Sequence, residues 1–102
     1  MVIAGWTTTV KWAQSHPELL QRFIKAFYQG IDFCNEQPAK VAGLLSSFTR
    51  IPPALAPKLR LPVFAHPLDM EALQRMADLT HKWGLVEKKP EVKKAIWPTA
   101  AQ

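Results

Sequence analysis

The 102-residue chain is poor in several residue types, and each shortage excludes a class of protein. Its one cysteine, Cys34, excludes an intrachain disulfide and a zinc site built on several cysteines. No apolar run approaches the roughly 18–20 residues that span a bilayer, which excludes a transmembrane helix. Acidic residues number 8 against 13 basic ones, and the resulting charge of +5 permits an anionic partner without requiring one.

The composition that remains predicts one ordered domain at most. Hydrophobic residues make up 48% of the chain and charged residues 21%, a balance that argues against disorder. Nine prolines and four glycines are typical of short helices separated by turns. Residues 1–6 lack the features of a secretory signal peptide. We therefore expect either that the protein stays in the cytosol or that its signal belongs to a longer chain.

The elements expected along the chain are one strand followed by helices. Residues 2–9 are β-branched and aromatic, interrupted by Gly5, and predict a strand. Capping-box spacing between Ser15 and Glu18, with Pro17 in the first turn, marks the start of a long helix. Gly84 after the last helical turn predicts a Schellman stop, with Leu85 folding back. The helices are expected over residues 10–14, 16–36, 38–49, 53–60, 69–83 and 90–97.

A single strand leaves its backbone donors and acceptors unpaired. We therefore expect residues 2–9 to pair with a second copy of the chain or with the sheet of a larger protein. The other interpretation, in which these residues extend the first helix, is disfavoured by Gly5 and the run of threonines after Trp6.

The sequence contains no phosphate-binding loop, paired-cysteine motif or nucleophile elbow. His16 and His66 each precede a proline and are interpreted as turn residues, and His81 is interpreted as a solvated partner of Asp78. Cys34 lies on the apolar stripe of the long helix and is expected in the core. The basic residues between positions 40 and 60 are separated by apolar residues, so we expect no nucleic-acid binding.

One aromatic position differs from the rest. Trp6 lies inside the expected strand and precedes Thr7 and Thr8. An aromatic ring beside aligned hydroxyl groups can line a small-molecule pocket, although packing against a neighbouring strand is the simpler interpretation. If any residues of this chain contact a ligand, we expect them to be Trp6, Thr7 and Thr8.

The order of these features resembles the C-terminal third of the periplasmic substrate-binding proteins of ABC importers. The closest type is that for nitrate, sulfonate, taurine and thiamine-pyrimidine precursors. The resemblance covers nearly the whole chain. Its most specific pieces mark helix boundaries: HPELL at 16–20 with F.KA at 23–26, NEQPAKVA at 35–42, and KWGLV at 82–86.

The resemblance implies an α/β fold of two lobes (type II), with solute held in the cleft between them. This chain, mainly α with one N-terminal strand, would be a partial domain of that fold. The full-length protein would be periplasmic or otherwise extracytoplasmic and would deliver its solute to an ABC permease. We expect no enzyme activity, cofactor, metal or direct membrane insertion, and no solute binding by the segment alone. The alternative is a free-standing helical module that homodimerises through its N-terminal strand.

Overall fold

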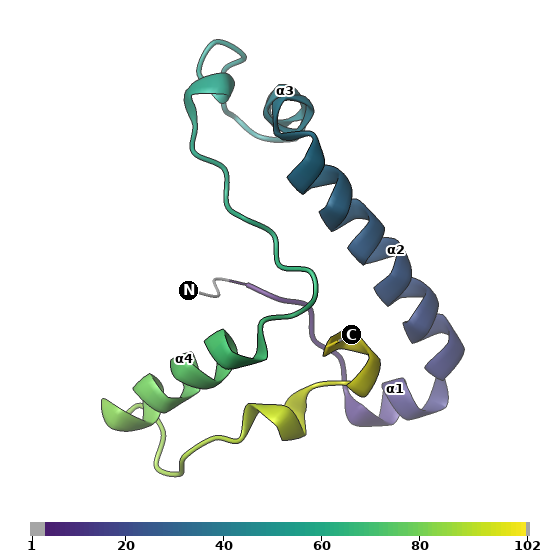
Figure 1. Cartoon of the computed structure of the whole chain (residues 1–102), viewed down its shortest axis with the longest axis vertical. Coiled ribbons are helices and arrows are strands. Elements are labelled where there is room, and N and C mark those ends of the chain that lie inside the picture. The colour runs from purple at the N-terminus through teal and green to yellow at the C-terminus, as the bar shows by residue number, and fades with distance from the viewer. Residues whose placement is uncertain (1–3, 102) are drawn as a thin grey trace. The chain divides into compact units, whose positions relative to one another are not determined.

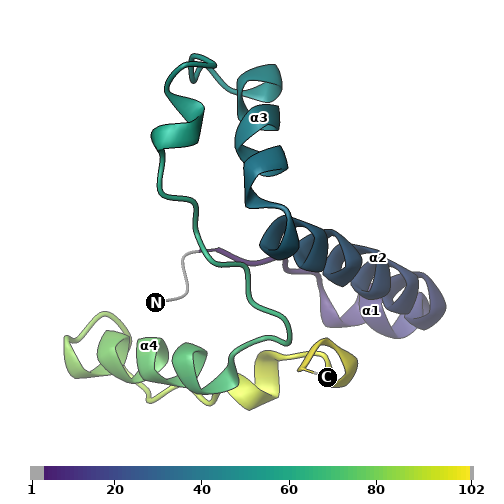
Figure 2. The same ribbon diagram turned by 45° about the horizontal axis from the view of Figure 1, so that its top comes forward.

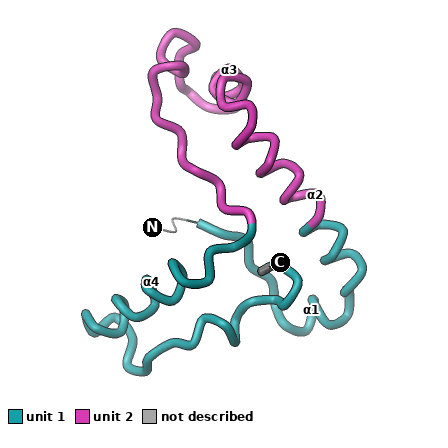
Figure 3. Tube along the Cα trace, viewed as in Figure 1, with its two compact units in different colours: residues 1–24, 67–102 teal, residues 25–66 magenta. Residues whose placement is uncertain are grey.

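The computed structural model describes residues 4–101, and every regular element among them is helical (Figure 1). The α-helices are α1 (Val10–Ser15), α2 (Pro17–Glu36), α3 (Pro38–Phe48) and α4 (Met70–Lys82). The short 3-10 helices are η1 (Ala56–Lys58), η2 (Val92–Ala95) and η3 (Pro98–Ala101). The chain divides into two compact units, residues 1–24 with 67–102 and residues 25–66 (Figure 3).

The prediction of an N-terminal strand is wrong for the described residues. Residues 4–9 are extended but form no strand, while positions 2 and 3 lie outside the described residues. Strand geometry requires a hydrogen-bonded neighbour, and the described part of the chain contains no other strand to supply one. The α/β class is therefore contradicted, and the described residues are helical.

The extended segment ends where α1 begins. Thr9 has extended backbone and its hydroxyl accepts a hydrogen bond from the Trp12 N–H at 3.1 Å, which caps α1. The Ser15 hydroxyl donates back to the Lys11 carbonyl at 2.8 Å. Ser15 thus belongs to the end of α1 and does not form the capping box expected for the next helix.

Helix α2 starts at Pro17, where the missing proline N–H leaves no helical hydrogen bond unmade. On its apolar face Leu20, Ile24 and Ile31 are buried, whereas Phe23 and Phe27 stay substantially exposed. The helix ends at Glu36, and Gln37 alone separates it from α3, which starts at Pro38. The expected range of 16–36 is therefore correct to within one residue.

Helix α3 packs through small residues. Ala42 is its buried residue, and η1 lies against α3 with Ala56 only 1% exposed. The large side chains of α3 point elsewhere, because Leu44 and Phe48 are both exposed. Packing through alanine brings the backbones of the two elements close together and buries little apolar area.

Helix α4 has a well-defined start and stop. The Asp69 side chain accepts a hydrogen bond from the Ala72 N–H at 2.9 Å. Gly84 has a φ of 74°, and the Leu85 N–H donates to the Thr80 carbonyl, which confirms the Schellman stop. Leu85 nevertheless remains 77% exposed, so it does not fold back on α4 as expected.

The chain after α4 turns back and runs along that helix (Figures 1 and 2). The amide of Gln74 connects the two segments: it donates to the Pro90 carbonyl at 2.9 Å and accepts from the Val92 N–H at 3.0 Å. Helix η2 therefore has a defined place beside α4. The helix expected over 90–97 is replaced by this shorter turn.

We predict that Gly84→Ala lowers the free energy of unfolding by about 1–2 kcal/mol, because an L-residue is strained in the left-handed region. Urea unfolding followed by circular dichroism at 222 nm would measure the change. Gly30→Ala is the matched control: it lies inside α2 with open space around its Cβ position, so it should leave stability unchanged or raise it. Equal stability of Gly84→Ala and the parent chain would contradict the prediction.

Candidate functional site

The predicted ligand-contacting residues lie in the exposed segment before α1. Trp6 is 76% exposed, and its ring meets the Phe23 ring edge-on at a centroid distance of 6.3 Å. Thr7 and Thr8 are exposed beside it. The structure thus brings the Trp6 ring to α2 and leaves the side chains of Thr7 and Thr8 in solvent.

Residues 25–66 contain a polar cluster that the sequence analysis did not predict. The Asp32 carboxylate lies 2.6 Å from Nδ1 of His66, and the His66 ring stacks on the Tyr28 ring at 4.1 Å with an interplanar angle of 5°. A neutral His66 would donate from Nδ1 to Asp32 and keep Nε2 as an acceptor. No local pattern predicts this pair, since the two residues stand 34 positions apart.

Asn35 makes a second connection between α2 and the same distant segment. Its side-chain amide donates to the Phe64 carbonyl at 2.8 Å and accepts from the Phe64 N–H at 3.3 Å. We call Asp32, Asn35, Phe64 and His66 the connector clasp, because they fasten residues 59–66, here termed the connector, to the last turns of α2. The clasp closes the loop that contains α3 and η1.

The groups of the clasp that can transfer a proton are the Asp32 carboxylate and the His66 imidazole. An Asp–His pair acts as a general base only beside a substrate or nucleophile. Within the described part of the chain, no serine, threonine or cysteine side chain hydrogen-bonds to His66. No group of three or more histidine, cysteine, aspartate or glutamate side chains among residues 4–101 is arranged to hold a metal ion. The observed hydrogen bonds of the clasp join the connector to α2.

The other histidines occupy local positions. Nδ1 of His16 lies 3.1 Å from the Trp12 carbonyl, and the two rings stack. His81 lies 3.3 Å from the Val86 carbonyl, while its expected partner Asp78 accepts from Gln74 and pairs with Lys89 at 3.6 Å. The expected His81–Asp78 pair is thus replaced by other contacts. Cys34 is half-buried.

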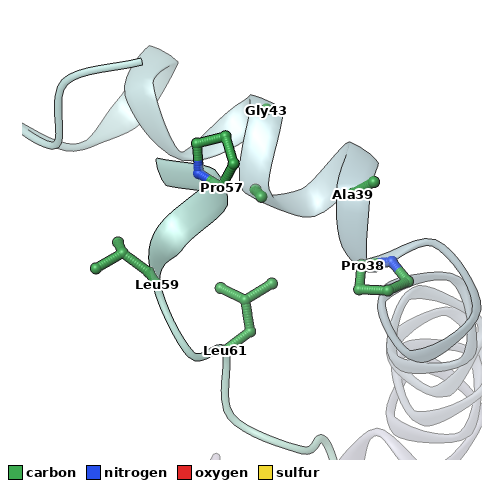
Figure 4. A pocket seen from close by; sticks show the side chains of 7 residues that line it. Pro38, Ala39, Gly43, Pro57, Leu59 and Leu61 are labelled. Carbon is green, nitrogen blue, oxygen red and sulfur yellow. The ribbon is translucent and has the colours of Figure 1, made fainter. Parts of the chain in front are cut away.

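The loop closed by the clasp contains an apolar groove between α3 and the chain that starts in η1 (Figure 4). Its volume is about 520 Å³, and most of its lining residues are exposed, so the groove is open to solvent. The lining side chains are small or aliphatic and carry no hydrogen-bonding group: Pro38, Ala39, Ala42, Gly43, Pro57, Leu59 and Leu61.

Three exposed cations, Lys40, Lys58 and Arg60, are next in sequence to lining residues but are not part of the lining. No acidic residue occurs between positions 37 and 68. The sequence revealed the basic residues but not the groove, which exists only because the chain folds back on α3.

Comparisons with protein-family models, with curated proteins and with solved structures find no match to this chain.

We predict that Asn35→Ala loosens the connector and lowers the free energy of unfolding by about 1 kcal/mol, because both hydrogen bonds to Phe64 are lost. Amide hydrogen exchange should accelerate at Phe64, whose N–H donates to Asn35. Gln29→Ala, at an exposed position of the same helix, should leave that exchange rate unchanged. Unchanged exchange at Phe64 in Asn35→Ala would show that the clasp does not hold the connector.

Proposed function

We propose that this chain is the C-terminal part of a solute-binding protein that delivers a small molecule to an ABC importer. The solute would be an anion such as a sulfonate, nitrate or taurine, or a pyrimidine-like compound. The proposal rests on the order of helices and helix boundaries described above, and on one structural observation that agrees with it.

That observation is how much hydrophobic surface the described residues leave uncovered. Val63 is 92% exposed and Trp83 73%, and aromatic residues of α2 such as Phe23, Phe27 and Phe33 are exposed as well. No side chain among the described residues is both large and fully buried. Apolar area on this scale is usually covered by further protein, and the remainder of a two-lobe binding protein would supply it.

The contribution of this chain to solute binding would come from Trp6, Thr7 and Thr8. Their exposure supports this role, since an indole ring and two hydroxyl groups are accessible on one short segment. A small anion requires donors and an enclosing surface from both lobes, so the 102-residue chain alone should not retain it. Closure of the lobes around the solute would present it to the permease.

The test begins with the coding frame upstream of the Met1 codon. A frame that stays open back to a secretory signal supports the proposal, and a stop codon with a ribosome-binding site just before Met1 contradicts it. Isothermal titration of the isolated chain with taurine should give no saturable heat. Micromolar taurine binding by the isolated chain would contradict the expected need for a second lobe.

In the longer protein we predict that Trp6→Ala weakens solute binding about tenfold, a loss of about 1.4 kcal/mol. Trp83→Ala is the matched control, because Trp83 is equally prominent on the surface but belongs to the end of α4. Taurine, nitrate and a pyrimidine would be titrated against both variants. Equal affinity of Trp6→Ala and the parent protein for a solute that binds would remove Trp6 from the site.

Self-association is the rival explanation of the exposed surface. Two copies of the chain could cover each other's hydrophobic residues without any transported solute. Light scattering would show this as a concentration-independent dimer, which together with a short natural gene product would favour the interaction module over the binding protein.

A further inference from the structure

We propose that a second copy of this chain packs antiparallel against the exposed face of α2, with the two-fold axis of the pair near residue 29. The proposal uses the spacing, exposure and charge of residues on this one helix. It goes beyond the proposed function and does not depend on it, because Val63 and Trp83, which that function also leaves to further protein, lie outside α2.

The exposed face of α2 follows the seven-residue repeat of helices that pack side by side (Figure 1). Phe23 and Gly30 form one row of this repeat, and a second row, three residues further along, contains Leu19, Ala26 and Phe33. All five residues are exposed, and the large ones remain so to a considerable degree: Leu19 is 51% exposed, Phe23 46% and Phe33 43%. These are the two rows through which one helix contacts another.

Gly30 has no role within the described chain that requires a glycine. Its φ is not positive, and an ideal Cβ added to it would meet nothing within 4 Å. A glycine inside a helix lowers the stability of that helix relative to alanine. A second helix would make use of the missing side chain, because Ala26 and Gly30 lie one turn apart and allow two backbones to approach closely.

An antiparallel pair brings complementary shapes together at one register. When Ala26 of one copy lies opposite Gly30 of the other, two-fold symmetry repeats the contact on the far side of the axis. Phe23 precedes Ala26 by the same three residues by which Phe33 follows Gly30. The register therefore also sets Phe23 opposite Phe33 of the second copy. Two aromatic layers then enclose the small ones and supply the buried area that alanine and glycine lack.

The charges beside this face match at the same register. Arg22, Gln29 and Glu36 stand seven residues apart and flank the two rows on one side. In an antiparallel pair this flank faces its own copy, so Arg22 lies opposite Glu36 and Gln29 lies opposite Gln29. All three side chains are exposed, and no ion pair among the described residues engages Arg22 or Glu36.

The same charges argue for a second copy and for the antiparallel direction. In a parallel pair the flank with Arg22 would face the opposite flank, which carries Phe27 and Cys34, and the charges would have no counterpart. An unrelated helix would have to carry both an acid and a base at this spacing. A second copy supplies them by symmetry.

The experiment starts with sedimentation velocity of the 102-residue chain over a range of concentrations. We expect the mass to rise from 11.5 kDa towards twice that value. Arg22→Glu and Glu36→Arg should each weaken the dimer about tenfold, because each change sets like charges opposite each other at two places in the pair. The variant that carries both changes should regain the parent affinity. Arg50→Glu, the same charge change at an exposed position outside α2, should have no effect.

Cysteine cross-linking tests the register. In the Cys34→Ser background, Gln29→Cys should form a disulfide-linked dimer under mild oxidation, because the two positions meet at the two-fold axis. Gln21→Cys is the matched control, since Gln21 is exposed on the opposite side of the same helix and should not cross-link.

A second pair of variants tests the close approach of the helices. Gly30→Leu should weaken the dimer at least about tenfold by holding the backbones apart, whereas Gly43→Leu adds the same side chain in open space on α3 and should not. Circular dichroism would confirm that each variant keeps its helices.

The remaining outcomes overturn the proposal. A chain that stays at 11.5 kDa at every concentration would leave the face of α2 to another part of a longer protein. Association that Gly30→Leu does not weaken, or that the double charge exchange does not restore, would place the interface elsewhere, for example in residues 4–9. Equal cross-linking of Gln29→Cys and Gln21→Cys would show random collision and no defined pair.

Discussion

The small size of the buried residues constrains the rest of this structure. Among the described residues, the buried ones are Leu20, Ile24 and Ile31 on α2 and four alanines on other helices: Ala13, Ala42, Ala56 and Ala72. An alanine methyl contributes little apolar area, and burial stabilises by about 25 cal/mol per Å². Contacts such as that between Ala42 and η1 therefore place elements close together while supplying little of the free energy that holds them there.

Hydrogen bonds from side chains to the backbone supply part of the free energy that holds the elements together. Gln74 bonds to both Pro90 and Val92, and Asn35 bonds twice to Phe64. In each case an amide, which can donate and accept at once, fixes an irregular segment against a helix. Because irregular segments have no hydrogen-bond ladder of their own, these amides decide where the chain returns after α3 and after α4.

The same arrangement determines which surfaces are available for binding. Large hydrophobic side chains remain exposed because the helices pack through faces that carry small residues. On α3, for example, Leu44 and Phe48 are exposed. The proposed role in a solute-binding protein explains this surface as one covered by further protein. The apolar groove differs from it in being lined by two elements, α3 and the chain that starts in η1.

Local sequence signals were sufficient for several helix boundaries, whereas the helices expected over 53–60 and 90–97 are only the short 3-10 helices η1 and η2. Pro17, Pro38, Asp69 and Gly84 act on their immediate neighbours through missing donors, capping oxygens or a permitted left-handed backbone, so the starts of α2, α3 and α4 and the stop of α4 could be predicted. The strand predicted over residues 2–9 was wrong for the described residues, because a β-branched composition does not supply the hydrogen-bonded neighbour that a strand requires. Tertiary structure alone decided the connector clasp and the apolar groove. Asp32 meets His66, and Ala42 faces Leu61, only after the chain has reversed direction, and a one-dimensional pattern contains no information about residues that become neighbours in that way.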